Sequence, residues 1–565
     1  MQLARRRISP ASVLMLLLIG AIGFLVLYPI GSVLVNGLIP GAGTGGRSVA
    51  AVWHAAFAQP GLAKSILNTL AVVALTEAIA FPVAIVIAWV LARTDIPGSS
   101  WLEFGFWLLF FLPALGTTTG WLILFDPNYG LANKLVIDLH LFAKPPFNMF
   151  SYGGIVFAHI STYSVAVLVM LLTPAFRNLD GSIEEAARVC GAGSLRALWN
   201  IVLPLVAPAL AVAFLMSLMR SLESFEIELF LGLPAQFSVY STKIYQLLRG
   251  DPPDYASATV LATLVLLVVI PLIIMQRWIS TRRSYATIGS HYRRTVRPLG
   301  RWRLPLFGVL FVAITGMSLL PLALQLAGSF MTLFGFFGLS SVWTTAHWSA
   351  AFSDPRLVTS LTNSLLLGTG TAIGAVVIYT IVAYCAVRLR GRLGSILDTV
   401  TWLPLTLPGI ILGFGYLRMV LQVPVFSPFY GSLAILMLIC WVTSITLGVQ
   451  VLKANMLQIS PELEEAARIV GAPQGRTFRD IVIPLALPAI VVVGVMVFSQ
   501  TLRQVSTIVL MSSGNTAPLS LLQLEYLSAG MLGPASVCGT LIVLMSVIAA
   551  AIVRIVTLRS RIRLR

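Results

Sequence analysis

Few residues of this 565-residue sequence have the types and spacing needed for chemistry on a substrate. Its four cysteines fall singly and its five histidines are scattered, so neither type is grouped as zinc ligands are. No G-x-x-x-x-G-K-[ST] occurs that would cradle the phosphates of ATP. Gly368, Gly370 and Gly374 form part of a dinucleotide-like fingerprint, but the third glycine is one residue late and no strand precedes it. We therefore expect no catalytic residue, metal site or cofactor in this chain, and we interpret these glycines as helix-packing positions.

Two acidic loops have a more informative spacing. The pattern E-A-A-x3-G-x9-I-x-[LI]-P occurs twice, with 19 residues from Glu185 to Pro204 and 19 from Glu465 to Pro484. Carboxylates favour a helix start, alanines continue a short helix, the glycine permits a turn, and the proline ends the second short helix. The loops 177–203 and 457–483 are therefore predicted to present short helices that plug into a partner.

Charged residues inside apolar segments are the other candidates, because a charge in hydrocarbon is costly unless it faces a cavity or a partner. Glu223 and Arg503 occupy equivalent positions in two such segments when the sequence is shifted by 280 residues. They are a candidate gate pair, and the alternative is an in-helix pair of Glu223 with Arg220 at i, i+3. The candidate pathway or gate residues are Arg220, Glu223, Glu226, Gln500 and Arg503.

The elements that carry these residues are predicted to be membrane-spanning helices. The sequence is 58% hydrophobic and 10% charged, which excludes an ordinary soluble enzyme. Apolar windows long enough to cross a bilayer occur near 11–35, 65–92, 102–125, 152–175, 204–232, 256–278, 304–328, 363–387, 396–421, 432–452, 484–511 and 534–556. We expect an all-α integral membrane protein of about twelve spans, because runs of this length must satisfy their own backbone hydrogen bonds.

The basic residues indicate which side of the membrane each loop occupies. The formal net charge of +17 would suggest a nucleic-acid partner in a soluble protein. When the residues are sorted by loop, 27 of the 37 fall on the side of the N-terminus, and seven fall on the opposite side. This is the positive-inside pattern, so we predict that both termini and both acidic loops are cytoplasmic and that no nucleic acid is bound.

The sequence also contains an internal repeat. A shift of 295 residues aligns Asn68 with Asn363, Arg93 with Arg388, Pro113 with Pro408 and Gly120 with Gly415, and a shift of 280 aligns the acidic loops. The predicted organisation is a first half at 1–279, a basic linker at 280–303 and a second half at 304–565. Because each half has an even number of spans, the two six-helix repeats are predicted to be parallel, with the substrate path at their interface.

The two acidic loops resemble the EAA loops of inner-membrane permease subunits of ATP-binding-cassette (ABC) importers. The whole chain resembles, span for span, fused type I permeases such as those for ferric iron, thiamine and aminoethylphosphonate. The resemblance implies that the loops form coupling helices that dock on a separate ATPase dimer, which binds ATP-Mg. The implied coupling residues are Glu184, Glu185, Ala186, Ala187, Gly191, Glu464, Glu465, Ala466, Ala467 and Gly471.

These observations predict a permease subunit of the bacterial inner membrane that works with an ABC ATPase dimer, an extracytoplasmic solute-binding protein and membrane lipid. Ferric iron is the expected substrate, with thiamine, aminoethylphosphonate or another small organic solute as alternatives. Carboxylates at Glu223, Glu226 and Glu228 suit a cation, whereas Arg220 and Arg503 suit an anion. A proton-coupled secondary transporter also has six plus six spans, but the two acidic loops argue against it.

Overall fold

The computed structural model describes residues 10–39, 48–179, 189–191, 193, 196, 198–282, 296–388 and 392–563. In these residues it consists of helices joined by short connections, with two isolated β-bridges, Thr94–Arg297 and Met331–Trp343. Ten helical stretches are long and apolar enough to span a membrane, and two bent helix pairs raise the number to twelve. The ten stretches and two pairs correspond one for one to the twelve predicted spans, so the all-α membrane fold is confirmed.

The helices that form these stretches fall into two six-span series. The first comprises α1 (Pro10–Leu38), α3 (Leu62–Arg93), α4 (Ser99–Phe111) with α5 (Ala114–Phe125), α7 (Tyr152–His159) with α8 (Val165–Arg177), α11 (Leu203–Glu223) and α14 (Tyr255–Arg282). The second comprises α15 (Arg303–Ser329), α17 (Pro355–Arg388), α18 (Arg392–Trp402) with α19 (Gly409–Gln422), α20 (Leu433–Met456), α23 (Ile483–Leu502) and α25 (Leu532–Arg563). Shorter helices lie between them: α2 (Val49–Phe57), α6 (Leu131–Asp138), α12 (Glu226–Gly232), α13 (Tyr240–Arg249), α16 (Ala346–Ser353), α21 (Pro461–Ile469), α22 (Gln474–Thr477) and α24 (Leu519–Ser528).

The third span of each half is broken at a proline. The angle between α4 and α5 is 99°, and the second pair, Arg392–Leu405 with Gly409–Gln422, is bent by 110°. Pro113 caps the start of α5 and Pro408 caps the start of α19, and the two prolines are equivalent in the repeat. Since proline removes a backbone donor and disfavours the helical conformation of the preceding residue, the sequence places the break at the same point in both halves.

A second repeated irregularity precedes the fifth span of each half. Wide, π-type turns occupy Leu198–Val202 and Phe478–Val482, at positions related by the 280-residue shift. Pro204 and Pro484 follow within the first two residues of α11 and α23. A proline cannot donate to the preceding turn and crowds its carbonyl groups, which favours a widened turn at this point.

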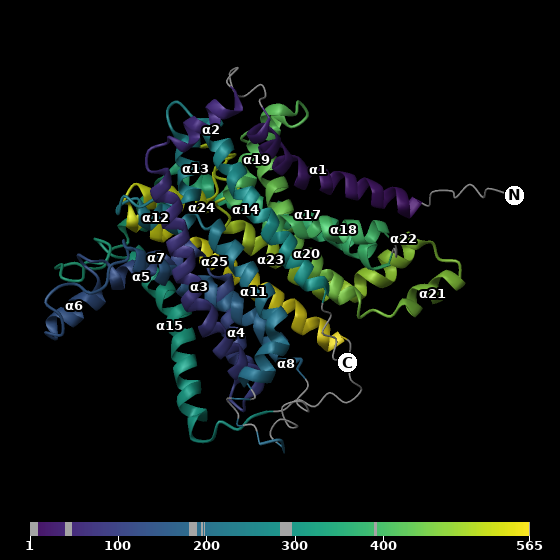
Figure 1. Ribbon diagram of the computed structural model, residues 1–565, viewed down its shortest axis with the longest axis horizontal. Helices are drawn as coiled ribbons and strands as arrows, with labels where there is room; N and C mark the ends of the chain where they lie inside the picture. The colour runs from purple at the N-terminus through teal and green to yellow at the C-terminus, as the bar shows by residue number, and fades with distance from the viewer. Residues whose placement is uncertain are drawn as a thin grey trace. The chain divides into compact units, whose positions relative to one another are not determined.

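The chain divides into two compact units that do not follow the order of the sequence. One unit combines Met1–Gly41, Asp354–Leu522 and Leu541–Arg565, and the other combines Ala42–Ser353 with Gln523–Thr540. Thus α1 packs on α18 and α19, and α15 packs on α4 and α5 (Figure 1). The first helix of each sequence half therefore belongs to a unit built mainly from the other half.

Equivalent glycines make room for these exchanged helices. A Cβ atom at Gly120 of α5 would lie 2.0 Å from the carbonyl oxygen of Pro321 in α15. A Cβ atom at Gly415 of α19 would lie 2.7 Å from the carbonyl oxygen of Pro29 in α1. Only glycine permits such backbone contact, so the repeated pair Gly120/Gly415 specifies the same exchanged packing in both units.

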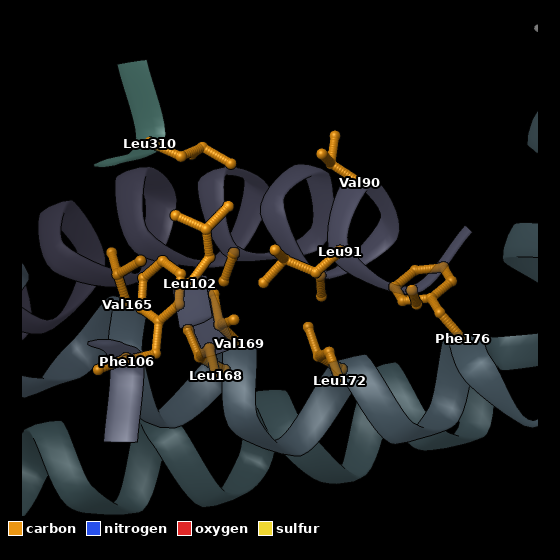
Figure 2. Close-up of a cluster of buried hydrophobic side chains, with 14 of the residues drawn as sticks. Val90, Leu91, Leu102, Phe106, Val165, Leu168, Val169, Leu172, Phe176 and Leu310 are labelled. Atoms are coloured by element: carbon orange, nitrogen blue, oxygen red, sulfur yellow. The ribbon is translucent and has the colours of Figure 1, made fainter. Parts of the chain in front are cut away.

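The hydrophobic core of the larger unit joins helices that are distant in the sequence. Figure 2 shows Leu91 of α3, Leu102 and Phe106 of α4, and Leu168 of α8 in one cluster, with Leu310 of α15 at its edge. Each of these side chains is at most 7% exposed. This core fixes α3 beside α8, and α3 carries Arg93 at the end that meets the first acidic loop.

Candidate functional site

The second acidic loop forms the two short helices that its sequence predicts. Pro461 occupies the first turn of α21, and the Ser460 side chain accepts a hydrogen bond from the backbone N–H of Glu462 at 3.3 Å. Gly471 ends the helix with a φ of +83°, in the left-handed region that favours glycine. Gly191, its equivalent in the first loop, has a φ of +82°, so the glycine expected to turn the chain has the same conformation in both loops.

One face of α21 is open to a partner. Glu465 and Ala466 are exposed, and the apolar side chains of Ile469 and Val470 are 86% and 82% exposed. Ala467 and Glu464 lie on the opposite face and are buried. A short helix that presents a carboxylate beside uncovered apolar side chains is suited to fill a groove in another protein.

Glu464 faces inward, where it joins α21 to the end of α17. Arg388 Nε donates to Glu464 Oε1 at 2.6 Å, and Tyr384 Oη donates to Glu464 Oε2 at 2.9 Å. Arg388 Nη2 also donates to the backbone oxygen of Ile459, at 2.8 Å. The sequence grouped Glu464 with the expected coupling residues, and in the structure its side chain joins α21 to α17 of the same unit. The feature of the sequence that pointed to this contact was the recurrence of Arg388 as Arg93 in the internal repeat.

The first acidic loop lies largely outside the described residues, including Glu184, Glu185, Ala186 and Ala187. Their role in coupling therefore stays a prediction. The residues beside this loop are described, however, and Arg93 Nη1 donates to the backbone oxygen of Leu179 at 2.9 Å. Arg93 corresponds to Arg388 and Leu179 to Ile459, so both loops are held at their start by the same bond.

The structure contains the in-helix pair considered for the fifth span. Arg220 Nη1 lies 3.7 Å from Glu223 Oε2, and both side chains are partly exposed. The predicted span 204–232 is divided in the structure: α11 ends at Glu223, and Glu226 begins the next helix, α12. Gln500 and Arg503 are partly buried at the end of α23. Glu223 and Arg503 belong to different compact units, and their pairing stays a prediction.

A buried polar cluster in the larger unit was not anticipated. His159 Nε2 lies 2.7 Å from Glu228 Oε1, and the side chains are 1% and 2% exposed. Tyr163 Oη lies 3.2 Å from the other ring nitrogen of His159, and Ser224 Oγ donates to the second oxygen of Glu228. The sequence treated His159 as a scattered packing residue, because no periodic signal connects it with a glutamate 69 positions away.

Glu77 is a second buried carboxylate of the same unit. Ser217 Oγ and Ser221 Oγ of α11 donate to Glu77 Oε1 at 2.8 Å and 2.7 Å, which joins α3 to α11. Beside Glu228, a cavity of about 160 Å³ is also lined by Gln236, Ser238 and Thr242. Among the residues that the structure describes, no three His, Cys, Asp or Glu side chains are grouped as metal ligands. In the part of the chain that the structure describes, these polar groups connect helices of the larger unit and line a small cavity.

The glycines of the fingerprint-like stretch lie in the middle of α17. A Cβ atom at Gly374 would lie 2.2 Å from the Trp441 ring of α20, and one at Gly368 would lie 2.8 Å from the Phe498 ring of α23. These contacts confirm that the glycines serve helix packing.

Comparisons with known proteins agree with this arrangement. The profile of the family described as "Binding-protein-dependent transport system inner membrane component" matches residues 48–285 and 378–562. The chain is similar to the ferric transport system permease protein FbpB of Actinobacillus pleuropneumoniae, with 26% identity over 70% of this chain and 57% of the relative. It is also similar to the probable ABC transporter permease protein y4fN of Sinorhizobium fredii, with 27% identity over 76% of each chain.

A solved bacterial ABC transporter involved in alginate import is 19% identical, with a TM-score of 0.40, over 48% of this chain and 96% of that one. The matched region spans 57% and 58% of the lengths of two ferric relatives, those of A. pleuropneumoniae and Haemophilus influenzae. The family profile covers well over half of the chain in two repeated segments. The chain therefore belongs to the family of binding-protein-dependent transport system inner membrane components.

Proposed function

We propose that this chain is the transmembrane permease subunit of an ABC importer in the bacterial inner membrane, with both termini in the cytoplasm. It forms the substrate path, and a separate ATPase dimer binds and hydrolyses ATP. The observation that carries this proposal is the open face of α21, where Glu465, Ala466, Ile469 and Val470 are exposed at the start of a motif that occurs twice. A helix anchored on one face and uncovered on the other is suited to receive force from a partner.

The direct test is co-purification of the chain with its cognate ATPase subunit. The double variant Glu185→Lys/Glu465→Lys is expected to lose the complex, because a reversed charge on each docking helix opposes the contact. Asp138→Lys is the matched control, since Asp138 is an exposed acid at the end of another short helix, α6. Substrate uptake that is driven by a proton gradient without any ATPase would refute the proposal and favour a secondary transporter.

Ferric iron is the substrate that we propose. Two observations support it: the similarity to ferric permease proteins and the buried carboxylates of Glu77 and Glu228 in one half of the chain. Carboxylate oxygens are the ligands that hard cations prefer. The alternatives are thiamine, aminoethylphosphonate and other small organic solutes.

An extracytoplasmic binding protein would deliver the substrate to the segments 36–64, 126–150, 233–255, 330–360 and 512–533. The ligand that co-purifies with that binding protein distinguishes the candidates. Uptake of radioactive ferric iron by vesicles that contain the complete transporter is the confirming measurement, and an organic ligand in the binding protein would refute iron.

A further inference from the structure

The C-terminal end of α17, at Tyr384 and Arg388, contacts the second acidic loop at three successive points. Before α21, Arg388 binds the backbone oxygen of Ile459 at 2.8 Å. Within α21, Arg388 and Tyr384 together bind both carboxylate oxygens of Glu464. After α21, the Tyr384 ring lies 4.8 Å from the Phe478 ring, centroid to centroid, at the start of the turn that leads into α23. One turn of α17 therefore holds the whole docking loop.

The Arg388–Glu464 pair is a strong attachment because it is shielded from water. Its side chains are 15% and 5% exposed. The guanidinium makes one charge-assisted bond to Glu464 and one bond to the Ile459 carbonyl, which fixes the angle between α17 and α21 as well as their distance. An exposed pair such as Arg479–Asp480, with side chains 73% and 47% exposed, imposes no comparable constraint.

The other end of α17 holds a segment far along the chain. Asn363 Nδ2 donates to the backbone oxygens of Asn515 at 2.9 Å and Ala517 at 3.3 Å. The neighbouring Ser364 Oγ accepts a hydrogen bond from the N–H of Leu519 at 2.7 Å. Because α17 has 34 residues, it is about 51 Å long. A single helix thus connects the docking loop to the segment after α23, which is predicted to lie on the opposite side of the membrane.

The first half repeats these attachments on α3. Arg93 Nη1 binds the oxygen of Leu179 at one end, and Asn68 Nδ2 binds the oxygen of Ser238 at 2.8 Å at the other. Trp89 stands at the position equivalent to Tyr384, and its buried indole N–H has no hydrogen-bond partner among the described residues. The equivalent of Glu464 is Glu184, which lies outside the described residues. The donor at Trp89 is therefore available to an acceptor in the first loop.

We propose that α3 and α17 are the struts that transmit the movement of the docking loops to the opposite face of the membrane, and that Arg388–Glu464 is the joint of the second strut. This inference rests on the proposed function. Arg388, Tyr384 and Glu464 are positioning residues, because they act through the helix that meets the ATPase and do not touch substrate. The open face of α21 determines whether the ATPase binds, whereas the buried face determines whether its movement reaches the path.

The test is the double variant Arg388→Met/Glu464→Gln in the complete transporter reconstituted with its ATPase and binding protein. It removes both buried charges together, so neither is left unpaired. Assembly with the ATPase and ATP hydrolysis are expected to persist. Substrate transported per ATP hydrolysed is expected to fall about tenfold, within the roughly 5- to 150-fold typical of coupling between two sites.

Controls separate transmission from a structural role. Glu462→Gln and Arg392→Lys change exposed residues close to the joint, and transport per ATP is expected to stay within about twofold of wild type. Arg388→Lys keeps the charge without the forked geometry and is expected to recover part of the coupling. Tyr384→Phe retains the ring contact with Phe478 and removes one bond to Glu464, so its loss is expected to be smaller than that of the double variant.

Two results would overturn the inference. Unchanged transport per ATP in the double variant would show that the joint carries no movement. Failure of only the joint variants to assemble would show that the pair merely holds α21 in place. Failure of the wild-type chain to bind any ATPase would instead refute the proposed function. Purifying the wild-type chain with its ATPase therefore separates a failure of the proposed function from a failure of this inference.

Discussion

Replacing Gly120 by alanine is expected to destabilise the packing of α5 on α15. The new Cβ atom would lie 2.0 Å from the carbonyl oxygen of Pro321, 2.6 Å from its carbonyl carbon and 2.8 Å from its Cα. Non-bonded carbon contacts are most favourable at about 3.5–4.0 Å, so α15 must move by more than about 1 Å. The obstacle is backbone and no side-chain rotation relieves it. We expect a loss near the upper end of the range for overpacking, about 3 kcal/mol in the free energy of unfolding.

The assay is reversible unfolding of the purified chain in detergent, compared between variants. Gly316→Ala is the matched control, because Gly316 lies in α15 with no atom within 4 Å of its Cβ position. It is expected to be neutral or to stabilise by up to about 1 kcal/mol through helix propensity. Gly415→Ala meets a less severe contact, 2.7 Å from the Pro29 oxygen, and is expected to cost less than Gly120→Ala. A Gly120→Ala protein within about 0.5 kcal/mol of wild type would refute the reasoning.

Three further predictions concern polar contacts. Glu228→Ala is expected to cost about 3 kcal/mol of unfolding free energy because it leaves the buried His159 ring without its closest hydrogen-bond partner. Glu223→Ala, in a partly exposed pair, is expected to cost less than about 1 kcal/mol, and equal losses would contradict this. Asn363→Leu removes two hydrogen bonds to the segment after α23, and amide exchange at 512–518 is expected to accelerate about tenfold or more; unchanged exchange would show that Asn363 does not hold it. Glu223→Arg with Arg503→Glu is expected to restore uptake lost in each single variant, and failure to restore it would argue against direct pairing.

Much of the fold could be predicted because lipid restricts the choices. Long apolar runs must be helices, and each of the twelve predicted windows corresponds to a helix or to a bent pair. Hydropathy does not reveal a bend, however, since both arms of a bent pair are equally apolar. The repeated Pro113 and Pro408 were visible in the sequence, but only the structure shows that each proline begins a new helix direction.

The candidate sites were predictable to different degrees. The two acidic loops were identifiable because their motif recurs at fixed spacing. The inward-facing role of Glu464 was not, because two adjacent glutamates look alike in the sequence and only packing determines which one turns toward Arg388. The His159–Glu228 pair joins α7 to α12, and such tertiary contacts produce no periodicity in a single sequence. The exchange of α1 and α15 could not be predicted either, since apolar periodicity does not indicate which helices pack against each other.

That exchange has a consequence for how the chain is made. Helix α1 emerges from the ribosome long before α19, whose Tyr416 hydroxyl donates to the Leu25 carbonyl oxygen at 2.9 Å and which begins only at Gly409. At about 5–20 residues synthesised per second, α1 waits roughly 20 to 70 s for this neighbour. During that time lipid or an insertion factor must cover the surface that α19 later occupies, so the smaller unit can form only after residues 354–522 have been made.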